Sequence, residues 1–295
     1  MNKEKPQFES FWKKEKNSNK EFKVDPEKTN SLAHEVEEAF SRNDFDTALE
    51  KLKELKRISS PEPLREEGAE FQEAREILGK DLIGPEEIKK VFNIELSPEE
   101  IEKVKDIPFS REELEKAKEL GMMLVLRVDH DRGGSPLTIS RLKEMFNGGD
   151  TLGAPGKKKD KIFYSKLGEG WYNNEDFATK ETAHLGWGLV AKSVLPETLN
   201  KNHEDQWKEV EKWAKKNSVD VKTLRRRTPI EVIYDEIAYY GANKESLLEE
   251  TYDWTSARSS GGGLVYVGSF DSDGLDVNGV GPDFSDSNLG VCPSR

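Results

Sequence analysis

Residues 258–295 read RSSGGGLVYVGSFDSDGLDVNGVGPDFSDSNLGVCPSR, and this stretch decides the fold of the C-terminal half. Apolar residues alternate in it with small or polar ones. Because successive side chains of a pleated strand point to opposite faces, this alternation predicts short β-strands with one buried face. The alternation slips at Gly268-Ser269, which predicts an irregularity in the strand there. The buried positions, called the anchors below, are Val265, Val267, Phe270, Leu275, Val277, Leu289 and Val291.

The residues between the anchors form a candidate ligand-binding surface. They are Tyr266, Ser269, Asp271, Asp273, Asp276, Asn278, Gly279, Val280, Gly281, Asp286, Ser287 and Asn288. Strand positions among them would face away from the anchors, and residues 279–288 would form a long polar loop. Tyr266 is the one large side chain in the set, so it is either the main contact to the ligand or a half-buried strand aromatic. The aspartates predict a ligand that is cationic or that donates hydrogen bonds.

The composition of this segment differs from that of the remaining chain. Between Ser259 and Ser294 there is no Lys, Glu, Gln, Trp or Met, although lysine and glutamate dominate elsewhere. These five amino acids cannot be reached when the adenines of an asparagine codon are replaced freely, whereas Tyr, Ser, Asp, Asn, Gly and Val can. A turn-rich β segment is also naturally rich in Gly, Ser and Asp. Composition alone therefore leaves a mutational and a structural explanation open.

A series of sequence blocks carries a resemblance over residues 115–295. In chain order they are LGMMLVLRV, LTISRLKEMF, WYNNEDFATKETAHLGWGLVAKSVLPETLNK, LRRRTPIEVIYDEIAYY, YDWTSARSSGGGLVYVG and LGVCPSR. They resemble blocks in variable proteins of diversity-generating retroelements, of the kind found in candidate-phylum bacteria. The Trp254-Thr255-Ser256 segment and the chain end are similar to the C-type-lectin-like domain shared with formylglycine-generating enzymes. The resemblance implies a fixed lectin-like backbone whose outward positions, within a variable region of about 257–295, are changed by retroelement mutagenesis.

The whole chain is expected to have an α+β fold in several parts. Residues 1–30 are polar and lysine-rich without periodicity, so they are expected to form a disordered tail. Residues 31–118 are expected to form a helical N-terminal region. Residues 119–295 are expected to form the C-type-lectin-like domain, with two main helices and a small antiparallel sheet.

Capping signals mark several helices. GPEEI, SPEEI and SREEL begin at Gly84, Ser97 and Ser110, and each places two acids in a first helical turn, which predicts three short capped helices. TPIE begins at Thr228 as a capping box with proline in the first position, and Gly241 is placed to end that helix. The run Arg225-Arg226-Arg227 predicts a solvated or salt-bridged turn, and Asp235-Glu236 are expected to be solvated.

Charge and hydropathy exclude several partners. Hydrophobic residues make up 34% of the chain and charged residues 35%, so the core should be small for the length. The formal charge of -12 repels phosphate and anionic lipid, so we expect no nucleic-acid partner and no membrane partner. The charged N-terminus has no apolar signal region, so a cytoplasmic location is expected. The partner would be a protein or a small molecule, and the oligomeric state stays open.

We expect a binding protein and not an enzyme, with no catalytic residue, cofactor or metal ion. Cys292, the one cysteine, lies in the closing strand, where a small buried hydrophobe is expected. His130 between Asp129 and Asp131 is the one histidine cluster, and a metal or acid–base role for it is a minor alternative. Residues 271–278 offer oxygens at alternate positions, as calcium loops do. A calcium-dependent lectin-like module and a structural scaffold without a variable site are therefore the alternatives.

Overall fold

The computed structural model describes residues 26–42, 44, 47–48, 51, 69–147, 162–163 and 170–295. The chain divides into two compact units, Met1–Glu67 and Gly68–Arg295. In the first unit, helix α1 (Pro26–Ser41) starts at Pro26 instead of Ser31 and buries Leu32, Val36 and Ala39. Residues 1–25 of the expected tail lie outside the described residues.

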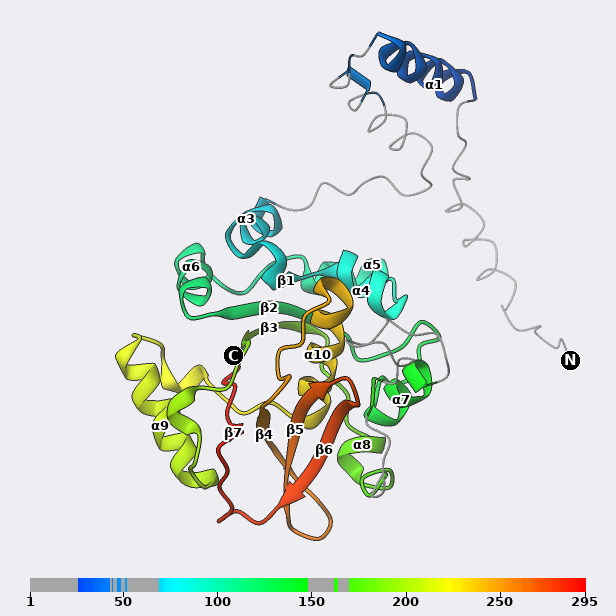
Figure 1. Cartoon of the computed structure of the whole chain (residues 1–295). Helices are drawn as coiled ribbons and strands as arrows, with labels where there is room; N and C mark the ends of the chain where they lie inside the picture. Colours follow the sequence, from blue (N-terminus) through cyan, green and yellow to red (C-terminus); the bar gives the residue numbers. More distant parts are fainter. Residues whose placement is uncertain are drawn as a thin grey trace, which may run out of the picture. The chain divides into compact units, whose positions relative to one another are not determined.

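The first sheet of the second unit has the strand order β1-β2-β3 (Figure 1). Strand β1 (Leu82–Ile83) is parallel to β2 (Met122–Arg127), and β2 is antiparallel to β3 (Gly186–Ala191). Every residue of β2 is buried. Because β1 pairs with β2, the compact unit begins at Gly68 and not at residue 119, and residues 69–118 do not form a separate helical region. A two-residue strand is too short to show a periodicity in the sequence.

The second sheet has the strand order β6-β5-β4-β7. Strands β4 (Tyr252–Arg258), β5 (Leu264–Asp271) and β6 (Gly274–Val280) are antiparallel neighbours, and β7 (Leu289–Gly290) runs parallel to β4. The predicted α+β class is therefore confirmed. Both sheets are mixed, in contrast to the single antiparallel sheet that we expected.

Helices flank both sheets. The repeated capping motif forms three helices as predicted: α4 (Pro85–Phe92), α5 (Pro98–Val104) and α6 (Arg111–Glu119). In each, a glutamate in the first turn accepts a hydrogen bond from the N–H of the cap residue. The other helices and 3-10 turns are α3 (Ala69–Leu78), η2 (Gly79–Asp81), α7 (Ile139–Asn147), α8 (Asp176–Thr179), η3 (Pro196–Thr198), α9 (His203–Lys216) and η4 (Val221–Thr223).

Helix α10 (Pro229–Asn243) is the central element and packs against β2, β4 and β5 (Figure 1). It begins at the predicted capping box, where the Thr228 N–H donates to Glu231 Oε2 at 2.9 Å. The expectation that Gly241 ends it was wrong, because the helix continues to Asn243. A Cβ at Gly241 would lie 2.6 Å from a Val91 methyl group, so glycine at this position allows α4 to approach closely.

A buried ion chain connects α10 to both sheets. From the second sheet to the surface its members are Asp253, Arg227, Asp235, Arg127, Glu231 and Arg225. The Arg127 Nη2 atom lies 2.7 Å from Asp235 Oδ2, and the Arg227 Nη1 atom lies 2.9 Å from the same oxygen. Three positive and three negative groups alternate, so the charges within the chain balance.

This arrangement resolves two expectations about charged residues. In the arginine run, Arg225 and Arg227 are salt-bridged, and Arg227 is only 1% exposed. Arg226 instead donates hydrogen bonds to the carbonyl oxygens of Trp254 and His203. The expected solvation of Asp235 and Glu236 was wrong, since both are fully buried. Although burial works against its charge, hydrogen bonds from Arg225 and the charge of Arg127 lower the pKa of Glu231 to about 2.

The C-terminal residues connect the two sheets. Arg295 and Leu189 of β3 exchange backbone hydrogen bonds of 2.8 and 3.1 Å, and Arg225 N–H donates to Ser294 O at 2.8 Å. Cys292 is fully buried, and this burial raises the pKa of its thiol well above the usual range. The Cys292 N–H donates to Asp253 Oδ1 at 2.8 Å, which ties the chain end to the buried ion chain.

Candidate functional site

The C-terminal strands separate the anchors from the candidate surface residues. Every anchor is at most 3% exposed, whereas none of the candidate surface residues is buried. The strand irregularity is also present: Ser269 has a φ of 50°, and the β5–β6 register shifts between Gly268 and Asp271. The bulge lets Val267 and Phe270 both point into the core while Ser269 stays partly exposed.

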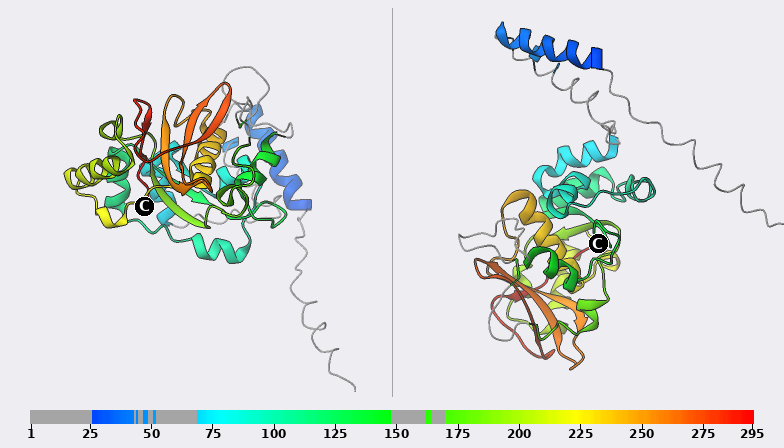
Figure 2. Two further views of the ribbon diagram at one scale, coloured as in Figure 1. Left: turned by 90° about the horizontal axis from the view of Figure 1, so that it is seen from below. Right: turned by 90° about the vertical axis from the view of Figure 1, so that its right-hand side faces the viewer.

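Strand register brings four side chains together on the side of the second sheet that faces away from α10. Tyr266 lies opposite Asn278, and Gly268 separates Tyr252 from Asp276. We call Tyr252, Tyr266, Asp276 and Asn278 the outer sheet face. The opposite side of β5 carries Val265 and Val267, which join the same core as α10. Figure 2 shows β5 and β6 at the surface of this unit, with α10 behind them.

Gly268 is required in the middle of the outer sheet face. A Cβ at this position would lie 2.1 Å from the Thr251 carbonyl oxygen and 2.7 Å from the Tyr252 Cα. Without a side chain between them, Tyr252 and Asp276 meet across the sheet, and the tyrosine hydroxyl lies 3.4 Å from Asp276 Oδ2. The Asn278 amide donates to the same carboxylate oxygen at 3.1 Å. The result is a polar group bordered by aromatic rings.

The electrostatics of the outer sheet face are acidic. Burial and the nearby groups Tyr252, Asp276 and Asp286 raise the pKa of Tyr266 to about 12, so its hydroxyl keeps its proton at neutral pH. The Tyr252 and Tyr266 rings meet edge to face at 5.1 Å. Within the described part of the chain, no lysine or arginine forms an ion pair with Asp276 or Asp286. Carboxylates beside aromatic rings favour a ligand that is cationic or donates hydrogen bonds.

The structure does not gather all the candidate surface residues in one place. Asp271 and Asp273 lie at the β5–β6 turn, where Asp271 Oδ1 accepts from the Asp273 N–H at 2.7 Å. Gly281, Ser287 and Asn288 lie in the loop at the opposite end of the hairpin. That loop is connected to the start of α9 by a 3.2 Å hydrogen bond from the His203 N–H to the Pro282 carbonyl, and Asn200 before the helix donates to the Asp286 carbonyl at 2.9 Å. The hairpin turn and the loop therefore flank the outer sheet face from two ends.

Sequence reasoning missed three aromatic residues of this region. Tyr252 completes the outer sheet face from β4. Trp171 is 38% exposed, donates from Nε1 to the Val277 carbonyl at 2.9 Å, and lies against Gly279 at the edge of β6. Phe284 is 42% exposed in the loop. Only Phe284 carried a sequence signal, as the one aromatic residue in an otherwise polar loop. These rings enlarge the apolar area available to a ligand.

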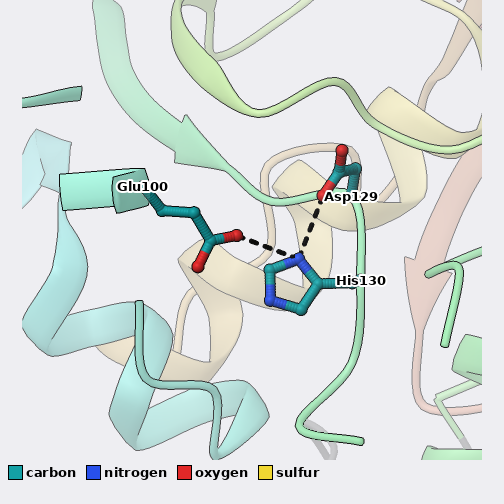
Figure 3. A group of neighbouring side chains, drawn as sticks. All are labelled: Glu100, Asp129 and His130. Carbon is teal, nitrogen blue, oxygen red and sulfur yellow. Dashed lines mark hydrogen bonds and ion pairs between the residues drawn. The ribbon is translucent and has the colours of Figure 1, made fainter. Parts of the chain in front are cut away.

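The aspartates of residues 271–276 do not form a metal-binding group among the described residues. A different cluster has that character: Glu100, Asp129 and His130, whose potential ligand atoms lie within 4.8 Å of one another (Figure 3). His130 Nδ1 is 3.3 Å from Glu100 Oε1 and 3.0 Å from Asp129 Oδ1. This cluster lies on α5 and after β2, outside the C-terminal strands.

Comparisons with protein-family models, with curated proteins and with solved structures found no significant match to this chain. None of the described helices is both long and apolar enough to cross a bilayer.

Proposed function

We propose that this chain is a non-enzymatic binding protein that presents the outer sheet face and the adjoining loop to a ligand. In this proposal the second unit is a C-type-lectin-like scaffold, and retroelement mutagenesis diversifies its exposed positions. One observation carries the proposal: the anchors of β5 and β6 are buried in the core, whereas Tyr266, Asp276 and Asn278 on the other side of the sheet contact solvent. Leu264 and Gly268, on that same side, are buried. Exchange of Asp276 and Asn278 would therefore leave the core between the sheet and α10 unchanged. Tyr266 also packs against a small buried cluster on its own side of the sheet, formed by Trp254, Leu264 and Leu289.

Two sets of contacts behind the outer sheet face support this function, because a binding surface needs a rigid support. The buried ion chain joins α10 to β4 through Arg227 and Asp253. The chain end adds a backbone connection from β7 to β3. Tyrosine, serine, asparagine and aspartate then provide adaptable hydrogen bonding and rigid aromatic contact, as in antibody loops.

The chemistry of the surface indicates the class of ligand. Asp276 and Asp286 lie close enough to Tyr266 to raise its pKa, and no described cation neutralises them. A guanidinium or ammonium group could pair with a carboxylate while contacting the tyrosine rings. We therefore propose a ligand with an exposed positive charge, such as a basic segment of a partner protein.

A panning experiment tests the binding function. A random peptide library on phage is selected against the full chain and against a variant carrying both Tyr266→Ala and Asp276→Asn. Arginine- or lysine-rich peptides should be enriched on the native chain and not on the variant. Glu204→Gln, which removes an acid from the exposed face of α9, is the matched control and should keep the enrichment. Equal enrichment on the native chain and the double variant would reject this surface as the binding site.

Genomic sequence tests the diversification. A reverse-transcriptase gene near this one, with a repeat that matches residues 257–295 except at adenine positions, is the expected finding. If no genome that carries a close relative of this gene has such a repeat, retroelement mutagenesis is excluded. Calorimetry with Ca²⁺ tests the calcium-dependent alternative separately: a micromolar site at residues 271–278 would favour it.

A further inference from the structure

Three metal-ligating side chains from separate parts of the chain converge beside the first sheet. Glu100 lies in helix α5, and Asp129 and His130 follow the end of β2. Figure 3 shows both carboxylates directed at the same nitrogen of the imidazole ring, Nδ1. A single Nδ1 proton cannot serve two carboxylates equally well. The convergence therefore suits a cation that contacts all three groups.

The spacing of the ligand atoms fits a metal ion. Zinc binds nitrogen and oxygen ligands at about 2.0–2.2 Å, which places neighbouring ligand atoms about 3.0–3.4 Å apart at octahedral to tetrahedral angles. His130 Nδ1 lies 3.0 and 3.3 Å from the two carboxylate oxygens. All three ligand atoms lie within 4.8 Å of one another, so side-chain movement can bring them around one ion.

The cluster is also held in position before any ion binds. Glu100 closes the capping box of α5: its Oε2 accepts from the Ser97 N–H at 2.8 Å, which leaves Oε1 directed at His130. The loop after β2 is folded around Asp131, whose Oδ1 accepts from the N–H groups of Gly133 and Ser135 at 2.7 and 2.9 Å. Asp131 Oδ2 also accepts from Arg141 Nε at 2.6 Å. These hydrogen bonds to Asp131 fix the conformation of the loop that carries Asp129 and His130.

Charge and donor type indicate the kind of ion. Among the described residues, neither Glu100 nor Asp129 forms an ion pair with a lysine or arginine, and His130 contacts both carboxylates. All three side chains are partly exposed, which gives an ion and its water ligands access. Imidazole with two carboxylates is a donor set for zinc and similar transition metals, whereas Ca²⁺ and Mg²⁺ prefer oxygen ligands alone.

We propose that Glu100, Asp129 and His130 bind one divalent transition-metal ion of the Zn²⁺ type, with water completing its coordination. The ion would connect α5 to the loop after β2 and so stabilise the first sheet. This site is independent of the ligand-binding surface on the second sheet, and either assignment can fail without the other.

Calorimetric titration of the full, chelator-treated chain with Zn²⁺ tests the proposal. The expected result is one site per chain, together with a rise in the melting temperature and, with Co²⁺ as the probe, visible absorption bands of a bound ion. His130→Ala should remove all three signals. Glu100→Gln keeps the capping hydrogen bond but replaces a charged ligand, so it should weaken binding at least tenfold.

Two controls make the result decisive. His34→Ala removes an exposed histidine that also lies near a carboxylate, that of Glu38, and it should leave Zn²⁺ binding unchanged. The melting temperature of metal-free His130→Ala should match that of the metal-free native chain within a few degrees, which shows that the variant is folded. Absence of a Zn²⁺ site in the native chain, or a site that survives His130→Ala, would overturn the proposal.

Discussion

The buried ion chain can be tested at Arg227, which links α10 to the second sheet. Arg227 is 1% exposed and contacts two fully buried carboxylates, Asp235 and Asp253, at 2.9 Å. Arg227→Met keeps much of the side-chain volume but removes the charge. Asp235 would still pair with Arg127, whereas Asp253 would keep only the hydrogen bond from the Cys292 N–H.

The expected loss follows from the unpaired Asp253 carboxylate. Burial already raises the pKa of Asp253 despite the charge of Arg227. Removal of one partner from a buried ion pair lowers the free energy of unfolding by about 3–5 kcal/mol. A domain of ordinary stability has only about 5–15 kcal/mol, so the effect should be large.

Urea denaturation at pH 7, followed by tryptophan fluorescence, measures this loss. Asp253→Asn added to Arg227→Met should restore part of the stability, by about 0.5–3 kcal/mol, because it removes the unpaired charge. Arg225→Met, in the same arginine run, is the control: Arg225 is half exposed and Glu231 keeps Arg127, so the loss should stay below about 1–2 kcal/mol. A loss below about 1 kcal/mol for Arg227→Met, or simple additivity in the double variant, would refute the role of Arg227 as counter-ion.

Three further predictions concern the core. Trp254→Ala should lower the free energy of unfolding by about 3–5 kcal/mol in urea denaturation, because the ring is fully buried; a loss below about 1 kcal/mol would contradict its place in the frame. Burial raises the pKa of Glu236 to about 8, so the native chain should lose stability as the pH rises from about 4.5 to 8. Glu236→Gln should remove that part of the pH dependence, and parallel stability–pH curves for the two proteins would contradict it. Gly241→Ala should destabilise by about 1–3 kcal/mol by forcing a methyl group onto Val91, and Val91→Ala in the same protein should relieve the strain; calorimetric melting checks both.

The sequence revealed features that depend on neighbouring residues. Caps at Ser97, Ser110 and Thr228 each need a partner only three residues away, and all three formed as predicted. The alternation around Tyr266 likewise depends only on the period of a strand. Such local patterns are independent of how the rest of the chain folds.

Features that depend on distant contacts were not predictable. Arg127 and Asp235 are 108 residues apart, and nothing in either local sequence indicates the other. Tyr252 joins the outer sheet face only because β4 pairs with β5, and Trp171 contacts Val277 from 106 residues away. The expectation that Gly241 ends α10 failed for the same reason, because its neighbour Val91 lies in another helix.

A substitution scan of β5 and β6 in the full chain tests the central claim most directly. Every amino acid is placed in turn at Val265, Tyr266, Val267, Val277 and Asn278, and the folded fraction is measured by resistance to proteolysis. Tyr266 and Asn278 should accept most amino acids, whereas the three valines should accept only apolar residues of similar size. If Tyr266 and Asn278 accept as few amino acids as the three valines do, the claim that the exposed side chains can be exchanged without loss of the fold is contradicted.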